Sequence, residues 1–260
     1  MYKTKLNIYN KFLLLIFNFF ILMINKNTIK LIKSLSLKKY RDKYNLFIVE
    51  GEKCIDELLS SSYEFKSLYC TKKLINKYAN YNVTEITEND LSKISTLSKP
   101  NNILAIVYIK QKKVKHFDGI TLVLDDVNNP GNLGTIIRTC DWFGVKNIVC
   151  SQNSVDVFNS KVVQSSMGSI FRVNIFYTNL IKYLNNVTTP IYAASLDGLN
   201  LSDQKFSTNL HLVMGNESNG ISNEVLKLVD KKICIDKRKG NAESLNVSVC
   251  ASIFLFKIFS

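Results

Sequence analysis

Short apolar runs of strand length alternate with longer helical patterns through the second half of the chain, and this alternation restricts the fold more than any other feature. Residues 120–124 form a continuous apolar run, of the kind that a strand buried on both faces needs. We predict the other strands at residues 147–150, 171–176, 190–194, 210–214 and 232–235, and the helices between them at residues 132–143, 161–167, 179–184 and 223–229. This order predicts an α/β fold with a mainly parallel sheet that helices cover on both faces.

A smaller α/β unit precedes this pattern. Its predicted helices are at residues 28–37, 51–60, 72–78 and 88–94, and its predicted strands are at residues 46–49, 66–70, 83–86 and 103–108. The next stretch is basic, contains no glycine and has almost no apolar period, so we interpret it as a linker. The predicted division is an extension at residues 1–26, a small domain at 27–110, the linker at 111–117 and a larger domain at 118–260.

The N-terminus contains an apolar run at residues 12–24, which is broken only by Asn18 and preceded by three lysines. The run resembles a signal peptide or a membrane anchor. It is shorter than the roughly 20 residues that a spanning helix needs, and no cleavage site of small residues follows it. A third interpretation, which we favour, is that translation starts at Met23 and that the preceding residues are a mis-assigned or dispensable extension.

The chain has 260 residues and a formal net charge of +13. Such a charge favours an anionic partner, either nucleic acid or a membrane surface. The alternative is that the many Lys, Asn and Ile residues reflect an AT-rich genome. We expect nucleic acid rather than a membrane as the partner.

The cysteines and histidines restrict the chemistry. The six cysteines lie far apart, without a C-x-x-C pair, and several fall inside apolar runs. They are typical of reduced core residues in a cytoplasmic protein. Because His116 and His211 are the only histidines, a His-rich metal site and a Ser-His-Asp triad are excluded, and we expect no metal.

Three polar segments interrupt the apolar second half, each at the end of a predicted strand. The first polar segment is residues 128–132, with Arg138 behind it, the second is residues 215–220, and the third is residues 243–246. Ligands of open α/β sheets bind beyond the carboxyl ends of the strands. The sequence therefore predicts one composite site built from three distant segments.

Each segment has an ordinary structural explanation when it is taken alone. Asn132 is a favoured N-cap residue after a turn at Pro130 and Gly131, and the glycines of the second segment suit a turn between strand and helix. The third segment opens a predicted helix at residues 244–259, in which the amide of Asn246 needs a partner. The acidic pair before the first segment is typical of a nucleotide hydrolase, but the chain has no G-x-x-x-x-G-K-[ST] phosphate loop.

The combination of segments resembles a known family. Residues 128–139 (NNPGNLGTIIRT), 212–220 (LVMGNESNG) and 243–249 (ESLNVSV) resemble the three ordered motifs of the SpoU (TrmH-like) branch of the SPOUT RNA methyltransferases. The resemblance covers residues 118–260, and residues 40–53 look like the start of the substrate-binding domain that these enzymes often carry. It implies a trefoil-knotted SPOUT domain that transfers a methyl group from S-adenosylmethionine to a ribose 2′-hydroxyl of ribosomal or transfer RNA.

The resemblance also implies the site residues. Its catalytic positions correspond to Arg138, Asn132, Glu217, Ser244 and Asn246, and its cofactor contacts correspond to Leu212, Val213, Met214, Gly215, Ile235, Leu245 and Asn246. Two departures concern Ile235: Asp236 stands where the family has proline, and residues 235–245 are one longer than usual. The family's arginine is a proposed proton acceptor, but a free guanidinium has a pKa above about 12, so we expect Arg138 to position a phosphate.

RNA contacts are expected from both domains. The candidates are Lys39, Arg41 and Lys43 in the small domain and Gln164, Ser166 and Arg172 near the site. The alternative for the lysines is a solvated helix face. The last helix is apolar nearly all round, which predicts that a second subunit covers part of it in a homodimer.

Two functions remain open at this point. The first is a ribose methyltransferase, for which ribosomal RNA is preferred over transfer RNA by analogy only. The second is a non-catalytic RNA-binding factor for ribosome assembly that uses the same fold, since a fold alone does not fix a function.

Overall fold

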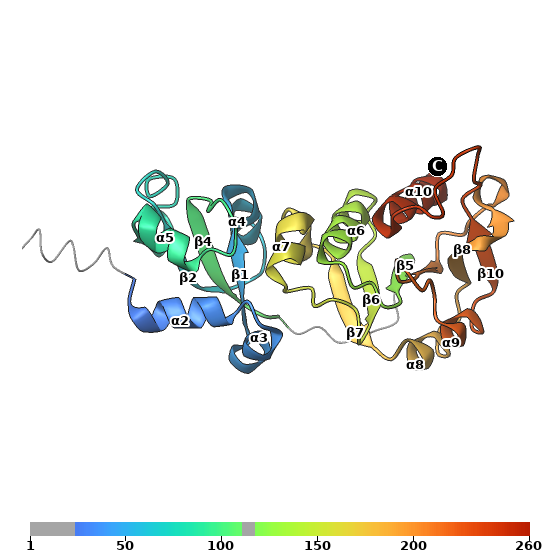
Figure 1. Cartoon of the computed structure of the whole chain (residues 1–260), viewed down its shortest axis with the longest axis horizontal. Helices are drawn as coiled ribbons and strands as arrows, with labels where there is room; N and C mark the ends of the chain where they lie inside the picture. Colours follow the sequence, from blue (N-terminus) through green and yellow to red (C-terminus); the bar gives the residue numbers. More distant parts are fainter. Residues whose placement is uncertain (1–23, 111–117) are drawn as a thin grey trace, which may run out of the picture. The chain divides into compact units, whose positions relative to one another are not determined.

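The computed structural model describes residues 24–110 and 118–260, which form two units (Figure 1). The first unit contains the described residues up to Leu59 together with Tyr63–Ile109, and the second contains Ser60–Ser62 and the remaining described residues. The apolar run up to residue 23, the proposed start at Met23 and the linker at 111–117 lie outside the described residues. None of the helices that are described has both the length and the apolar character needed to cross a membrane.

The first unit is a mixed sheet with helices on both faces. Its strands are β1 (Leu46–Glu50), β2 (Phe65–Cys70), β3 (Val83–Glu85) and β4 (Ile103–Tyr108), in the order β1-β4-β2-β3. Its helices are α2 (Lys26–Ser34), α3 (Lys38–Tyr44), α4 (Glu52–Leu59) and α5 (Glu88–Ile94). Helices α2 and α5 pack on one face through Ile32 and Ile94, and α4 contacts β1 and β4. Because both faces are covered, every residue of β1 is buried.

Local contacts change two of the predicted helices. The side chain of Asn25 accepts a hydrogen bond of 2.8 Å from the backbone N–H of Thr28, so α2 begins at Lys26 and ends before the separate helix α3. Residues 72–78, predicted as a helix, form turns instead. The hydroxyl of the buried Tyr78 donates a hydrogen bond of 2.8 Å to Asp56 Oδ1 of α4. This tertiary contact holds the segment in place although it is not helical.

The second unit is a six-stranded, fully parallel sheet in the order β10-β8-β9-β5-β6-β7. The strands are β5 (Ile120–Leu124), β6 (Asn147–Ser151), β7 (Asn174–Thr178), β8 (Ile191–Asn200), β9 (Leu210–Met214) and β10 (Lys231–Cys234). The predicted α/β fold with a mainly parallel sheet is therefore confirmed. The trefoil knot stays a prediction of the family resemblance.

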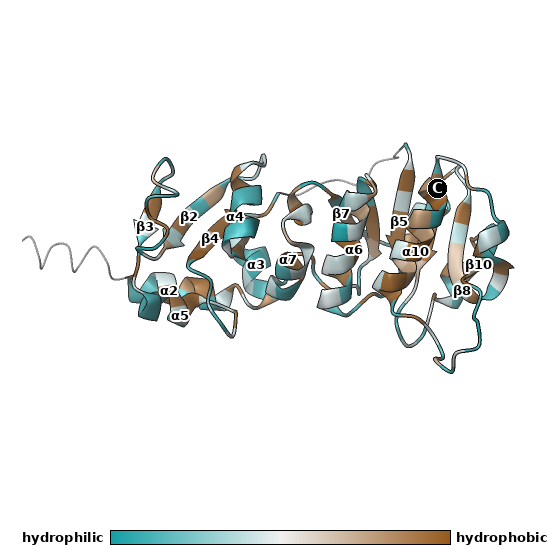
Figure 2. Cartoon of the chain, turned by 90° about the horizontal axis from the view of Figure 1, so that it is seen from above, coloured by the Kyte–Doolittle hydropathy of each residue, from teal (hydrophilic) through white to brown (hydrophobic). Residues whose placement is uncertain are grey.

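Helices cover both faces of this sheet. They are α6 (Pro130–Trp142), α7 (Ser160–Ser166), α8 (Leu180–Leu184), α9 (Asn223–Leu226) and α10 (Val247–Phe259). Figure 1 shows α6 and α10 above the strands and α8 and α9 below them. Val123, Val149 and Val213 pack with α8 and α9, and the alternation of side chains along a strand sends their neighbours to the opposite face. Figure 2 shows brown, hydrophobic segments along β5.

Helices α6 and α7 approach closely at a glycine. A Cβ atom on Gly134 would lie 1.9 Å from Ser165 Oγ and 2.7 Å from the carbonyl oxygen of Val162. Both distances are far below van der Waals contact. Only glycine therefore allows this packing, which fixes the position of α6 and of the polar segment at its start.

We expect Gly134→Ala to lower the free energy of unfolding by about 1–2 kcal/mol, because the methyl group forces α6 and α7 apart and the gain in helix propensity offsets only part of this cost. Urea denaturation followed by circular dichroism measures the change. Gly240→Ala is the matched control, since a Cβ at Gly240 meets nothing within 4 Å. Equal stability of the two variants would contradict the close approach.

Candidate active site

The first and second polar segments meet because β5 and β9 are neighbours in the sheet. Leu124 pairs with Met214 at the carboxyl ends of these strands, and the next N–H, of Asp125, donates to the carbonyl oxygen of Met214 at 2.9 Å. In the sheet, β6 and β7 lie beyond β5 on one side, and β8 and β10 lie beyond β9 on the other. The two segments therefore lie at the point where the strand order reverses, the usual ligand site of such sheets.

The acidic pair after β5 holds the second polar segment. Asp125 is buried, and its Oδ2 accepts a hydrogen bond of 2.8 Å from the backbone N–H of Ser222. Asn216 Nδ2 donates to the carbonyl oxygen of Asp126 at 2.8 Å. Sequence reasoning considered these aspartates only as hydrolase residues and missed this role. Their position directly after a buried strand was the available signal.

The second polar segment is a tight loop that glycine makes possible. Asn216 and Gly220 form an antiparallel bridge, with N–H to oxygen distances of 2.9 and 3.0 Å. A Cβ on Gly215 would lie 2.2 Å from the carbonyl carbon of Gly220, which itself has a φ of +68°. Because the loop closes on its own backbone, it presents the exposed side chain of Glu217 outward.

Helix α6 begins earlier than the sequence predicted, and this changes the role of Asn132. The N-cap is Asn129, whose Oδ1 accepts from the N–H groups of Gly131 at 2.8 Å and Asn132 at 3.2 Å. Pro130 takes the first helical position, where its missing N–H costs nothing. Asn132 is therefore not the N-cap but a residue of the first turn, and its side chain is free to make tertiary contacts.

The side chain of Asn132 joins all three polar segments. Its Nδ2 donates to Glu217 Oε1 at 2.7 Å, and its Oδ1 accepts from Asn246 Nδ2 at 3.0 Å. The amide nitrogen thus acts as a donor and the amide oxygen as an acceptor, as their chemistry requires. The composite site that the sequence predicted contains these three residues.

The third polar segment reaches the site through the packing of α10 on α6. Thr139 Oγ1 lies 3.3 Å from Ser252 Oγ, and the rings of Phe143 and Phe259 stack with centroids 5.8 Å apart. The helix starts at Val247, not at residue 244, because the Oδ1 of Asn246 caps it by accepting from the N–H of Ser248 at 2.9 Å. The partner that the amide of Asn246 was expected to need is Asn132.

Two of the predicted catalytic residues stand apart from this network. Arg138 and Ser244 are exposed, and within the described residues neither side chain forms a hydrogen bond or an ion pair. Arg138 lies on α6, six residues after Asn132. The structure therefore joins Asn132, Glu217 and Asn246 by hydrogen bonds and leaves the Arg138 guanidinium available to a ligand.

The residues expected to contact a cofactor differ in accessibility. Leu212 and Val213 are fully buried, and β9 lies between β8 and β5, so their side chains pack within the sheet. A contact of either residue with a cofactor stays a prediction. Gly215 and Ile235 are partly accessible, and Leu245 is exposed. The side chain of Met214 is buried, so only the backbone at this end of β9 lies at the edge of the site.

Two of the residues expected to bind RNA are structural instead. Arg41 is 3% exposed, and its Nη1 donates to the carbonyl oxygens of Leu35 and Ser36, both at 2.9 Å. Ser166 is buried, and its hydroxyl donates to the carbonyl oxygen of Val163 at 2.8 Å. The expectation is wrong for these two because sequence patterns show residue type but not burial.

The other four RNA candidates reach the surface. Lys39 and Lys43 are exposed on α3, and Gln164 is partly buried. Arg172 donates from Nε to Asp141 Oδ2 at 2.9 Å, and its Nη2 lies 2.8 Å from the same oxygen. Burial alone would raise the pKa of Asp141, but the hydrogen bonds and charge of Arg172 lower it. The Arg172 guanidinium is therefore partly engaged within the protein.

His211 is the one histidine within the residues that the structure describes, and its surroundings are those of the core. His211 is buried, with Tyr183 Oη 2.8 Å from its Nε2 and Thr189 Oγ1 2.8 Å from its Nδ1. No group of three or more His, Cys, Asp or Glu side chains positioned to hold a metal ion occurs among the residues that the structure describes. His211 is thus a core residue.

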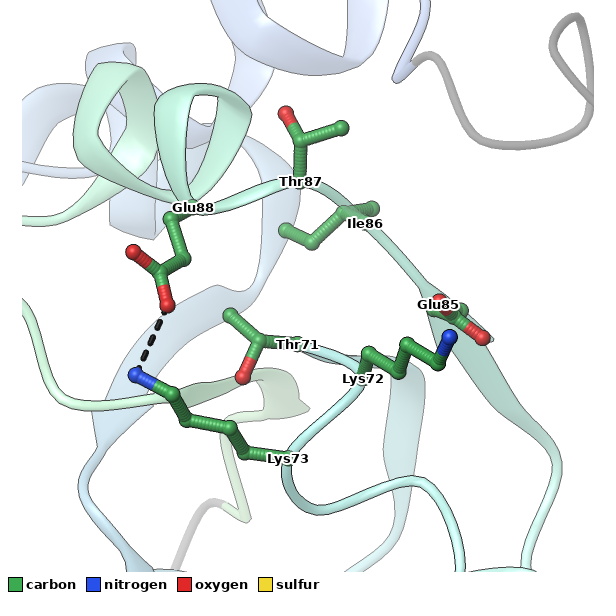
Figure 3. A pocket seen from close by; sticks show the side chains of 7 residues that line it. All are labelled: Thr71, Lys72, Lys73, Glu85, Ile86, Thr87 and Glu88. Carbon is green, nitrogen blue, oxygen red and sulfur yellow. Dashed lines mark ion pairs between the residues drawn. The ribbon is translucent and has the colours of Figure 1, made fainter.

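An open hollow of about 500 Å³ in the first unit lies at the ends of β2 and β3 (Figure 3). Its charged lining residues are Lys72, Lys73, Glu85 and Glu88. Lys73 Nζ pairs with Glu88 Oε1 at 2.8 Å, and this ion pair lowers the pKa of Glu88. Two positive and two negative side chains give the hollow no preference for an anion, so the site at β5 and β9 remains the stronger candidate.

Known proteins resemble this chain in sequence and in fold. The 23S rRNA (guanosine(2553)-2′-O)-methyltransferase RlmP of Bacillus subtilis (strain 168) is 30% identical over 233 residues, which are 87% of this chain and 93% of that protein. A solved TrmH-family structure from Porphyromonas gingivalis is 34% identical, with a TM-score of 0.82, and the match covers 90% of this chain and 98% of that one. A structure titled as an AdoMet-bound rRNA methyltransferase from Sinorhizobium meliloti is 27% identical, with a TM-score of 0.82 and coverage of 90% and 95%.

Two family models match the chain. The model of the MRM3-like substrate binding domain matches residues 26–105. The model of the SpoU rRNA Methylase family matches residues 119–256, the range that contains all three polar segments and the bridge at Asn132. The family predicted from the three segments is confirmed: this chain belongs to the SpoU rRNA methylase family.

Proposed function

We propose that this chain transfers a methyl group from S-adenosylmethionine to a ribose 2′-hydroxyl in RNA, with ribosomal RNA preferred over transfer RNA. The observation that carries the proposal is the bridge at Asn132, which joins the three polar segments beside an accessible arginine. The ribosomal preference is supported by the names of the matching family and of the Bacillus subtilis relative, both of which refer to rRNA.

The residues at the strand ends fit the cofactor. An adenosyl thioether needs apolar surface beside a few backbone polar groups. Ile235 and Leu245 are accessible apolar side chains that follow β10 and precede α10, and Gly215 offers backbone without a side chain. When bound there, S-adenosylmethionine would supply the electrophilic methyl group. We therefore propose Gly215, Ile235, Leu245 and Asn246 as the residues that hold it, together with the strand end at Met214.

The protein's contribution to the reaction is positioning and charge. Asn132 fixes the carboxylate of Glu217, which orients a ligand hydroxyl by accepting its hydrogen bond. Arg138 is exposed, forms no hydrogen bond or ion pair with any described residue, and binds the phosphate next to the target ribose. A guanidinium carries a delocalised positive charge, which stabilises negative charge that develops near the ribose oxygen. Ser244 is proposed to shape the ribose pocket.

We expect Arg138→Ala to lower the rate of methyl transfer to RNA by at least about 100-fold, because a preorganised charge at the reacting group is lost. Transfer of labelled methyl groups to RNA measures the rate. The melting temperature and the affinity for S-adenosylmethionine should stay unchanged, since the exposed side chain of Arg138 forms no hydrogen bond or ion pair within the described residues.

Arg138→Lys is the matched variant, because it keeps the charge and removes the bidentate fork. It should retain more activity than Arg138→Ala. Full activity of Arg138→Ala would contradict the proposed role. Tight RNA binding by the wild type without any methyl transfer or S-adenosylmethionine affinity would indicate the alternative, a non-catalytic RNA-binding factor.

We expect Asn246→Ala to lower the free energy of unfolding by about 1 kcal/mol, because α10 loses its cap. Asn246→Asp keeps an oxygen for the N–H of Ser248 and should remain within about 0.5 kcal/mol of the wild type. Both variants lose the Nδ2 donor to Asn132 and should lose methyl transfer. If Asn246→Asp were fully active, the bridge to Asn132 would not be required; urea denaturation and methyl transfer are measured together.

We also propose that the chain forms a homodimer through α10. Three apolar side chains of α10 and that of the residue before its cap are exposed at spacings that place them along one stripe: Leu245, Val249, Phe256 and Phe259. Figure 2 shows α10 coloured toward the hydrophobic end of the scale. An exposed apolar stripe of this kind is typical of an interface, and a second copy is the proposed occupant.

We expect the wild type to sediment as a dimer at micromolar concentration and Phe256→Glu to sediment as a monomer, because the charge would be buried without a partner. Phe256 is 66% exposed, so the substitution does not disturb the fold of the monomer. Leu196→Glu is the control, since Leu196 is 78% exposed on β8. A monomeric wild type in analytical ultracentrifugation would overturn the proposal.

The remaining assignments concern the first unit and the compartment. We propose that residues 27–110 bind the RNA substrate, supported by the match to the MRM3-like substrate binding domain. We propose the cytoplasm as the compartment, supported by six cysteines that are all free thiols.

A further inference from the structure

Helix α3 presents a pair of stacked tyrosine rings. Tyr40 and Tyr44 lie one helical turn apart, with ring centroids separated by 6.2 Å and planes inclined by 11°. Tyr44 is 41% exposed, and Tyr40 is partly exposed. Two parallel rings at a surface offer a flat aromatic platform, which a buried core pair does not.

The ammonium group of a lysine lies over each ring of the platform. Lys39 Nζ lies 4.9 Å from the centroid of Tyr40, and Lys43 Nζ lies 5.3 Å from the centroid of Tyr44. At exposed sites such contacts contribute only about 0.5–1 kcal/mol. A planar ligand can therefore displace an ammonium group from a ring face and leave it free to bind a neighbouring anion.

The platform is held rigidly by residues that face inward. The buried Arg41 fixes α3 to the end of α2 through the carbonyl oxygens of Leu35 and Ser36. At the other end, Asn45 adopts a left-handed conformation with a φ of 55°, and its Nδ2 donates to the carbonyl oxygen of Ile109 at 3.2 Å. A platform held at both ends loses little entropy when a ligand binds.

The surrounding charge favours a polyanion. Residues 25–45 contain one acidic side chain, Asp42, and seven basic ones: Lys26, Lys30, Lys33, Lys38, Lys39, Arg41 and Lys43. On a helix of 3.6 residues per turn, Lys39 and Lys43 lie beside the two tyrosines, whereas Asp42 lies beyond the lysines, about 160° around the helix from Tyr44. The aromatic surface therefore has positive charge along one edge, and the single carboxylate lies on the far side of the lysines from the rings.

We propose that this face of α3 binds an unpaired stretch of RNA, with a base stacked on the Tyr40–Tyr44 platform and the flanking phosphates bound by Lys39 and Lys43. Unpaired bases expose the flat surface that tyrosine rings bind, whereas bases inside a duplex are covered by their neighbours. The inference rests on the proposed RNA substrate, and it adds that the first unit selects single-stranded segments. A protein partner with an acidic surface would use the lysines without needing the ring faces.

The experiment measures binding of the full chain to a short, fluorescently labelled unpaired RNA and to the same RNA annealed to its complement. We expect tighter binding of the unpaired RNA, and a loss of about ten-fold in affinity for it in Tyr44→Ala. Tyr44→Phe should bind like the wild type, because it keeps the ring. Tyr81→Ala is the matched control, since Tyr81 is an equally exposed tyrosine of the first unit, at 41%.

Salt dependence separates the two kinds of contact. Lys39→Gln and Lys43→Gln should each reduce the slope of log affinity against log salt by about 0.7, whereas Tyr44→Ala should leave the slope unchanged. Binding of Tyr44→Ala at wild-type affinity, or equal loss in Tyr44→Phe, would overturn the inference. Loss in the lysine variants alone would also overturn it and would indicate a purely electrostatic surface.

The measurement is independent of catalysis. If the wild type binds unpaired RNA through Tyr44 but transfers no methyl group, the proposed methyltransferase function fails and the platform stands. If it methylates RNA while Tyr44→Ala binds normally, the platform fails and the enzyme stands. Circular dichroism of each variant confirms that α3 and the first unit remain folded.

Discussion

The amide side chain of Asn132 is the contact on which the candidate site depends. It connects Glu217, 85 positions later in the chain, with Asn246, 114 positions later, by one donated and one accepted hydrogen bond. An amide is the only neutral side chain that offers a donor and an acceptor side by side in a fixed plane. An aspartate at this position would repel the carboxylate of Glu217, and an alanine would leave both neighbours without their shared partner.

This contact exists only because the backbone delivers the three segments to one place. The register of β5 and β9 brings the first two together, and the buried carboxylate of Asp125 holds the second loop by its bond to Ser222. Gly215 allows that loop to close on itself. The packing of α10 on α6 brings the third polar segment to the same place. The site is thus a product of sheet order and helix packing, while its loops are held by short polar contacts.

The two units present different chemistry. In the second unit the side chains of the candidate site are few and are held by hydrogen bonds, apart from Arg138, which has no hydrogen bond or ion pair among the residues that the structure describes. In the first unit the accessible groups are lysines and stacked tyrosines on α3, which suit a ligand recognised by charge and shape. Within the first unit, Arg41 is buried and supports the helix that displays the lysines and tyrosines.

The sequence by itself determined the fold class, the family and the three polar segments, because side-chain periodicity and short motifs are local properties of the chain. It also indicated that the amide of Asn246 needs a partner. Only the tertiary structure decided that this partner is Asn132, that α6 starts at Pro130, and that Leu212, Val213, Arg41 and Ser166 are buried. Burial and hydrogen-bond partners depend on segments that are distant in sequence, and a residue's type does not reveal which of its neighbours in space will cover it.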